Sequence, residues 1–356
     1  KVEWMAFDSR LPAAYQEEGP VVTRIGTDHL VTFDYAEPSP IMLFFQRWWR
    51  RSILMLKVGV VVGAVLAYPV MTVMSHRIDD SDVLLATSQN WASPEAGVAI
   101  NKIARELEGT GWAGDRASWH PQARLTAMPA WQKATADALA EHTRLLAVMS
   151  PVNGEPDADL TAAARLLHGM PGDDMRPRLT SAAEALNRFD TRAARGLAIQ
   201  PDRLELLKAE ARQFAGWAET DLTDLSTQIN RDVVEWPASR TDIIAFYGAK
   251  ARAHVAREML MATERSEPRL GRTPDVQAAM TRAKDAWGRA ARMKPLIVSN
   301  QPGDGMLMAN HLASMGFFLA EAKIASLALA DALDAVPGED LESVASLDPD
   351  LVATAP

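Results

Sequence analysis

Cysteine is absent from the 356-residue chain, and its absence removes several kinds of chemistry. Without a thiol the chain has no disulfide, no thiolate ligand for a metal and no cysteine nucleophile. Aromatic residues make up only 6% of the sequence, whereas hydrophobic residues make up 48%. Because Ala, Leu, Met, Arg and Glu recur throughout and are good helix formers, the composition predicts an all-α fold.

A basic excess is also lacking, since the formal net charge is -9 and the sequence pI is about 5.4. Phosphate backbones need clustered Lys and Arg, so we expect no nucleic-acid partner. No nucleophile elbow, phosphate-binding glycine loop or zinc signature is present, and we expect no cofactor. These absences leave enzyme activity unsupported but open, because catalytic residues need not be close in sequence.

One long apolar run, residues 53–74, is the most informative feature of the sequence. It holds 22 residues, and Lys57 is its only charge. At about 1.5 Å per residue it measures about 33 Å, enough for a hydrocarbon core of about 30 Å. We predict that this run is a transmembrane helix, and that it is the only one.

The charges on either side of the run predict its orientation. Three arginines precede it closely, whereas Arg77 alone follows it, beside Asp79, Asp80 and Asp82. The positive-inside rule therefore places the N terminus in the cytoplasm and the rest of the chain across the membrane. The residues expected at the membrane interface are Arg47, Trp48, Trp49, Arg50, Arg51 and Lys57.

Small residues recur every four positions within the run, at Gly59, Gly63 and Ala67. This spacing places them on one face of a helix, where the backbone of a second helix can approach closely. We expect a partner helix there, from another membrane subunit or from a second copy of the chain. A chance pattern in a Gly- and Ala-rich span is the alternative.

The rest of the chain predicts an antiparallel helical bundle. Helices are expected at 93–107, 129–149, 201–236, 241–264, 273–293 and 306–336, with the last central to the core. The predicted regions are an extended cytoplasmic arm at 1–40, a juxtamembrane interfacial segment at 41–52, the transmembrane helix at 53–74, a helical periplasmic domain at 75–337 and an acidic flexible tail at 338–356.

Two groups of short motifs resemble the DUF2333 family of uncharacterised proteobacterial proteins. The first group is Asp82 to Thr87, Gly109 to Trp112 and Met128 to Trp131; the second is Phe246 to Ala249, Pro295 to Asn300 and Ala309 to His311. They bracket most of residues 82–333, but the stretch from about 151 to 200 departs from the pattern. The resemblance implies a single-span inner-membrane protein with a helical domain, and it implies no activity.

A few polar residues are candidates for a pocket in the predicted domain. His254 and Glu258 are four apart, so both side chains can reach one metal ion, but two ligands do not make a site. We therefore predict no metal site. His311 is a candidate base or ligand, although a histidine that anchors the 300–305 loop is the simpler interpretation. The candidate pocket residues are Trp119, His254, Glu258, Asn300 and His311.

These patterns predict a membrane-anchored structural, accessory or assembly protein of the bacterial inner membrane. Such a protein would contact the lipid bilayer and act through protein–protein contacts. The alternative is a periplasmic enzyme, or a domain that binds a ligand or metal, using the candidate pocket. The catalytic residues of such an enzyme are not identified by the sequence.

Overall fold

The computed structural model describes ten ranges of the chain: 39–75, 78–82, 91–108, 111–117, 119–170, 172–231, 238–267, 273–295, 297–301 and 309–336. Within these ranges the regular structure is helical and no strand is formed, so the predicted all-α class is confirmed. The predicted acidic tail and the predicted arm as far as residue 38 lie outside the described residues.

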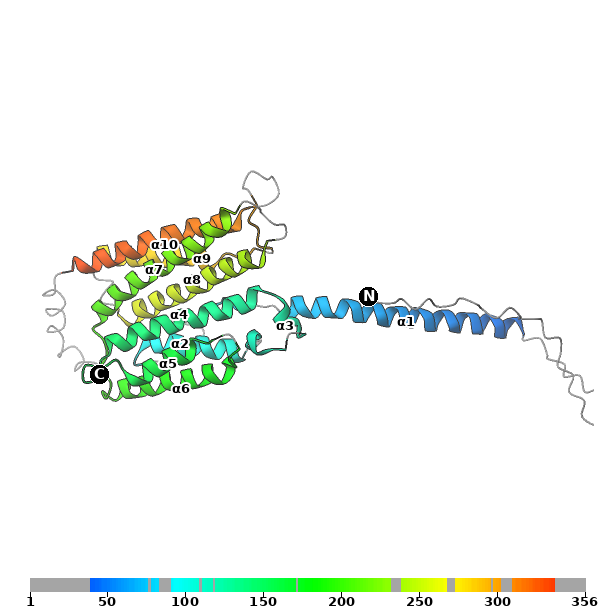
Figure 1. Cartoon of the computed structure of the whole chain (residues 1–356), viewed down its shortest axis with the longest axis horizontal. Helices are drawn as coiled ribbons and strands as arrows, with labels where there is room; N and C mark the ends of the chain where they lie inside the picture. The colour runs from blue at the N-terminus through cyan, green and yellow to red at the C-terminus, as the bar shows by residue number, and fades with distance from the viewer. Residues whose placement is uncertain are drawn as a thin grey trace, which may run out of the picture. The chain divides into compact units, whose positions relative to one another are not determined.

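The helix α1, Pro40–Ser75, contains both the predicted interfacial segment and the predicted span (Figure 1). The helix is continuous through residues 52 and 53, where the two predicted regions meet. Most of the described apolar side chains of α1 are exposed, among them Leu54, Val61 and Leu66. A helix that exposes this much apolar surface has no stable environment in water.

In the described part of the chain, a different helix is long and apolar enough to be a candidate membrane span. That helix is α10, His311–Asp334, and one third of its most apolar stretch is buried. The described residues of α1 contain no stretch that qualifies in the same way. The membrane-spanning role of α1 therefore stays a prediction.

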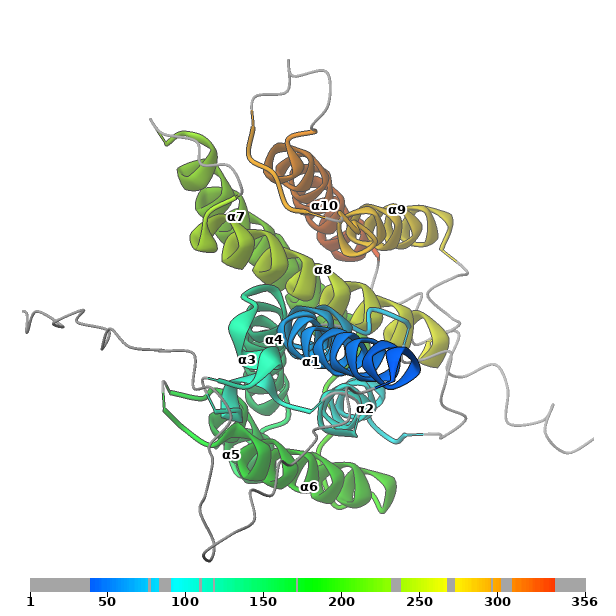
Figure 2. The ribbon, with the colours of Figure 1, turned by 90° about the vertical axis from the view of Figure 1, so that its right-hand side faces the viewer.

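The remaining helices form the predicted bundle, in which α8 is the central element (Figures 1 and 2). It packs against α2 and α4 on one side and against α7, α9 and α10 on the other, while α5 and α6 cover α2 and α4. The bounds are Pro94–Glu108 for α2, Pro121–Arg124 for α3, Ala127–Met149 for α4, Ala158–Leu167 for α5, Met175–Ala194 for α6, Arg203–Ile229 for α7, Arg240–Ser266 for α8 and Pro274–Ala291 for α9. A 3₁₀ turn, η1, covers Ala113–Asp115.

The expectation that the last helix is central to the core is wrong. One face of α10 packs on α7 and α9 through Leu312, Met315 and Leu319. Its opposite face leaves Phe317 and Ile324 exposed. Since α10 is apolar on most sides, its composition did not reveal that only one face is buried.

Local capping explains where several helices begin. Ser239 and Asp242 form a capping box at the start of α8, each side chain accepting a hydrogen bond from the other residue's backbone N–H. Asp157 accepts hydrogen bonds from the first turn of α5, as expected for a helix cap. The helix α7 ends at Ile229, earlier than the predicted end at residue 236.

Large aromatic side chains of α7 and α9 contact one another in the core. The Phe214 ring lies 5.1 Å from that of Trp217 and 6.4 Å from that of Trp287. The indole N–H of Trp287 donates to Ser326 Oγ at 2.9 Å, which satisfies its one polar atom in the core. These contacts join α7, α9 and α10.

Candidate functional site

A short segment that follows α1 is bound to the bundle by ion pairs. The two carboxylate oxygens of Asp80 lie 2.8 Å from Lys250 Nζ and 2.7 Å from Lys294 Nζ. Burial alone would raise the pKa of Asp80, but the hydrogen bonds from these lysines outweigh it and the pKa lies below its ordinary value. Asp80 is therefore a charged link between the segment and the bundle.

The neighbours of Asp80 make further contacts with α2 and α8. Asp82 forms an ion pair with Arg257 of α8. Arg105 of α2 donates a hydrogen bond to the Ser81 carbonyl and lies 3.8 Å from Asp79. Several residues of the 79–82 segment therefore have a partner in the bundle.

His254 of α8 lies at the centre of this cluster and is almost fully buried. Its Nε2 lies 2.9 Å from the Asp80 carbonyl oxygen, and its Nδ1 lies 2.6 Å from Lys102 Nζ. A carbonyl oxygen only accepts, so we assign the proton to Nε2, which leaves Nδ1 to accept from Lys102. Burial and the Lys102 charge hold the pKa of His254 well below its ordinary value, so the ring is neutral.

Lys102 of α2 is the buried cation of the cluster. Burial lowers its pKa to about 8, and the opposing charge of Glu258 limits that shift. Trp131 of α4 closes the cluster, with its ring 5.5 Å from that of His254 and 5.7 Å from Lys250 Nζ. A cation–π contact of this kind stabilises a partly desolvated ammonium.

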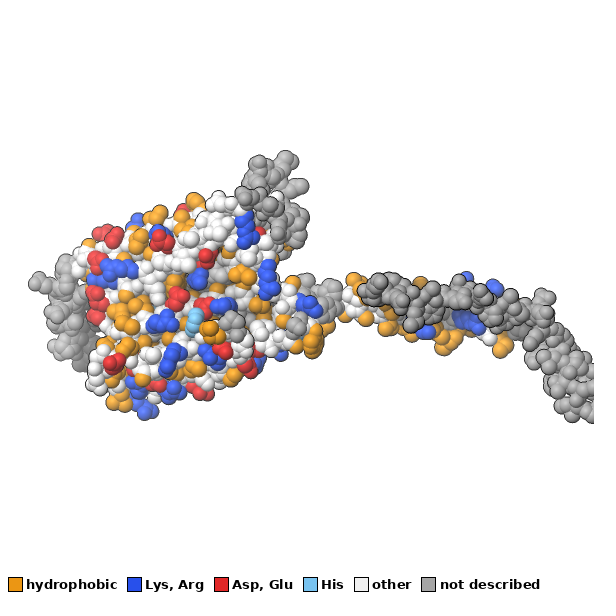
Figure 3. Space-filling model, in the orientation of Figure 1, with side chains coloured by type: hydrophobic (Ala, Val, Ile, Leu, Met, Phe, Trp, Pro, Cys, Tyr) orange, Lys and Arg blue, Asp and Glu red, His pale blue; other side chains and the backbone are white. Residues whose placement is uncertain are grey.

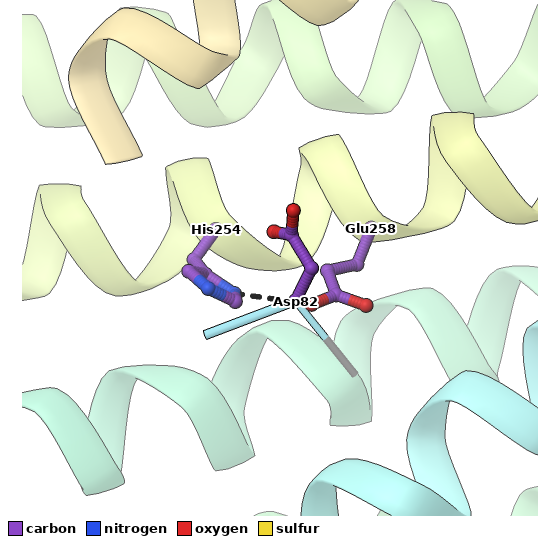
Figure 4. Close-up of side chains that lie close together, drawn as sticks. All are labelled: Asp82, His254 and Glu258. Atoms are coloured by element: carbon purple, nitrogen blue, oxygen red, sulfur yellow. Dashed lines mark ion pairs between the residues drawn. The ribbon is translucent and has the colours of Figure 1, made fainter. Parts of the chain in front are cut away.

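Three side chains of the cluster have the chemistry of a metal site. Ligand atoms of Asp82, His254 and Glu258 all lie within 4.8 Å of one another, and Figure 4 shows them converging from α8 and the 79–82 segment. However, Lys102 already donates to His254 Nδ1, and Arg257 already pairs with Asp82. The chain supplies its own cations here, so the cluster is best explained as an internal network of ion pairs.

The other candidate pocket residues do not join this cluster. Asn300 and His311 lie together, because the Ser299 N–H donates to His311 Nδ1 at 3.1 Å and the Asn310 amide lies 3.4 Å from Asn300 Oδ1. His311 therefore anchors the backbone next to the loop, because its Nδ1 accepts a hydrogen bond from the Ser299 N–H. Trp119 is 68% exposed.

Most members of the cluster were not predicted from the sequence. His254 and Glu258 were candidates, whereas Asp80 entered only as a charge that flanks the predicted span, and Asp82 as such a charge and as the start of one family motif. Lys102 was not singled out at all. The only signal in its favour is its position on α2, between the buried Ala99 and Ile103.

A pH-dependent stability follows from the neutral His254. Between its low folded-state pKa and the unfolded value of about 6.5, the unfolded chain binds a proton that the folded chain does not, so stability falls as the pH falls through that range. Relative to a His254→Gln variant, the free energy of unfolding should fall by roughly 1.4 kcal/mol more between about pH 7.5 and pH 5.5. Glutamine suits the comparison because its amide can accept from Lys102 and donate to the Asp80 carbonyl without titrating. An equal fall in both proteins, measured by denaturant titration, would show that His254 is not buried as a neutral ring.

The contacts of the cluster bind the 79–82 segment to the helical bundle. They do not indicate a chemical reaction. Comparison with known proteins adds no activity. No protein-family model, curated protein or solved structure matches the chain.

Proposed function

We propose that the chain is a single-pass protein of the bacterial inner membrane, with α1 as its span, the N terminus in the cytoplasm and the helical domain in the periplasm. The apolar run within α1 supports the span, and the arginines before it support the orientation. The domain would act as a structural or accessory element that contacts other membrane proteins. The resemblance to the DUF2333 family agrees with this proposal.

The single observation that carries the proposal is the ion-paired segment directly after the run. Only three residues separate Met74, the last residue of the run, from Ile78. The four residue-to-residue steps between them reach at most about 14 Å. Asp80 and Asp82 are then bound to α8. If residues 53–74 cross the membrane, the bundle is held close to the membrane surface, as suits a protein that contacts other membrane subunits.

The proposal predicts that α1 packs against a partner helix through Gly59, Gly63 and Ala67. A Cβ atom added at Gly59 or at Gly63 meets no atom of the described residues within 4 Å, so no described residue covers the helix at these two positions. Gly63→Ile should weaken association with the partner, because a branched side chain holds the two backbones apart. Size and composition of the complex extracted in mild detergent measure this effect.

The control for this experiment is Val61→Ile, which enlarges the helix elsewhere and keeps it apolar. Insertion is expected to be normal in both variants, since neither adds a charge. If the Gly63→Ile complex matches the parent in size and composition, α1 serves only as a membrane attachment.

Metal binding is the second candidate function, favoured by the three converging groups Asp82, His254 and Glu258. The Lys102 ammonium would have to leave His254 Nδ1 before an ion could bind there. Elemental analysis of the full-length protein, prepared without a chelator, distinguishes metal binding from a structural role. A stoichiometric metal that is lost in the His254→Gln variant would favour metal binding.

A further inference from the structure

A cavity of about 440 Å³ lies outside the charge cluster, between η1, α4, the junction of α5 with α6 and the first residue of α8. We propose that this cavity binds a small organic anion with an apolar body, such as an aromatic carboxylate. The inference does not depend on membrane insertion, because every wall of the cavity belongs to the bundle. Its volume is in the range usual for small-molecule sites.

The apolar part of the wall suits a hydrophobic body. Trp112, Ala136, Leu167 and Met175 line the cavity, and all four are buried. Gly169 lets the Met175 side chain pack directly against the backbone, because a Cβ atom there would lie 2.1 Å from Met175 Sδ. A larger residue at position 169 would push the methionine from its place.

The acidic residues of the wall already have partners. Asp137 lies 2.6 Å from Lys133 Nζ and 3.3 Å from His168 Nδ1. Asp173 lies 3.3 Å from Arg178 NH1. Asp115 accepts from two backbone N–H groups at the start of α6, at 2.9 and 2.8 Å. Because these carboxylates are already paired within the chain, they do not favour a cationic ligand.

Two hydrogen-bond donors of the cavity wall, in contrast, can still bind a ligand. Arg240 is exposed at the start of α8, and no carboxylate within the described ranges pairs with it. The Trp112 indole N–H likewise has no hydrogen-bond partner in the part of the chain that is described. A guanidinium binds a carboxylate through two parallel hydrogen bonds. The apolar floor and the unpaired guanidinium together point to an anion that carries a hydrophobic group.

The test uses the full-length protein in detergent and isothermal titration calorimetry with 4-phenylbutyrate, corrected for titration into empty micelles. Saturable binding at one site is expected. Arg240→Gln should weaken it at least tenfold, because a hydrogen bond to a charged group is lost. Arg212→Gln is the matched control, since Arg212 is also exposed on a bundle helix but pairs with Asp334 away from the cavity.

Two further measurements separate the apolar and the charged parts of the proposal. Ala136→Leu should abolish binding, because the larger side chain fills the cavity, while the circular dichroism spectrum is retained. The uncharged analogue 4-phenylbutan-1-ol should bind at least tenfold more weakly than the acid. The proposal is overturned if the acid does not bind, if the alcohol binds equally well, or if Arg240→Gln and Arg212→Gln bind alike.

Discussion

Replacing Lys102 with methionine should lower the free energy of unfolding by about 3 to 5 kcal/mol, the usual cost of removing one partner from a buried group of charges. Methionine fills a similar volume, so the loss comes from charge and hydrogen bonding. His254 Nδ1 would lose its donor, and the buried Glu258 would lose a compensating charge. Denaturant titration of the detergent-solubilised protein, followed by circular dichroism, measures this change.

Lys323→Met is the control, because Lys323 lies at the bundle surface and its ion pair with Glu219 is largely exposed. Exposed pairs of this kind contribute about 0 to 1 kcal/mol. Adding Glu258→Gln to Lys102→Met should recover part of the stability, since the uncompensated negative charge is removed. Equal small losses for Lys102→Met and Lys323→Met would contradict the assignment of Lys102 as the buried cation.

Two arginines placed in the middle of the predicted span should release the protein from the membrane. Val61 and Val65 are four residues apart and lie near the centre of residues 53–74. Each arginine at the centre of a span costs about 2.5 to 3.5 kcal/mol on the insertion scale, so the pair costs roughly 6 kcal/mol. The Val61→Arg, Val65→Arg double variant should therefore appear in the supernatant after alkaline carbonate extraction.

The matched control changes both valines to leucine, which keeps the run apolar, and this variant should stay in the pellet. A double-arginine variant that stays in the pellet would show that residues 53–74 do not determine membrane association. In that case α10, which is also apolar and long enough to span, would be the next segment to test.

The sequence predicted the long helices better than the short ones. The apolar positions of α7 recur every three or four residues, and the structure buries Phe214 and Leu225 as that spacing indicates. No helix bounds were predicted in the region from 151 to 200, yet it forms α5 and α6. The helix α5 has only 10 residues. In α6 the buried residues Leu179, Ala182, Leu186 and Phe189 recur every three or four positions, a helical period that we missed among its charged residues.

The candidate site could be predicted only where its residues share one helix. His254 and Glu258 are four apart on α8, and helical geometry alone places them side by side. Lys102 is 152 residues from His254 in the sequence, and Asp80 is 174 residues away. Only the packing of α2 and the 79–82 segment against α8 brings these groups together, and no local pattern encodes it.

The most direct test of the account is the labelling of single cysteines with a membrane-impermeant maleimide, which is clean because the chain has no cysteine of its own. The three positions are Gln46 before the span, Val62 within it and the exposed Ser226 of the bundle. The account predicts that Ser226→Cys is labelled in intact spheroplasts, Gln46→Cys only after lysis, and Val62→Cys only after the protein is denatured in detergent. Labelling of Val62→Cys in aqueous buffer as readily as Ser226→Cys would contradict the membrane-spanning role of α1.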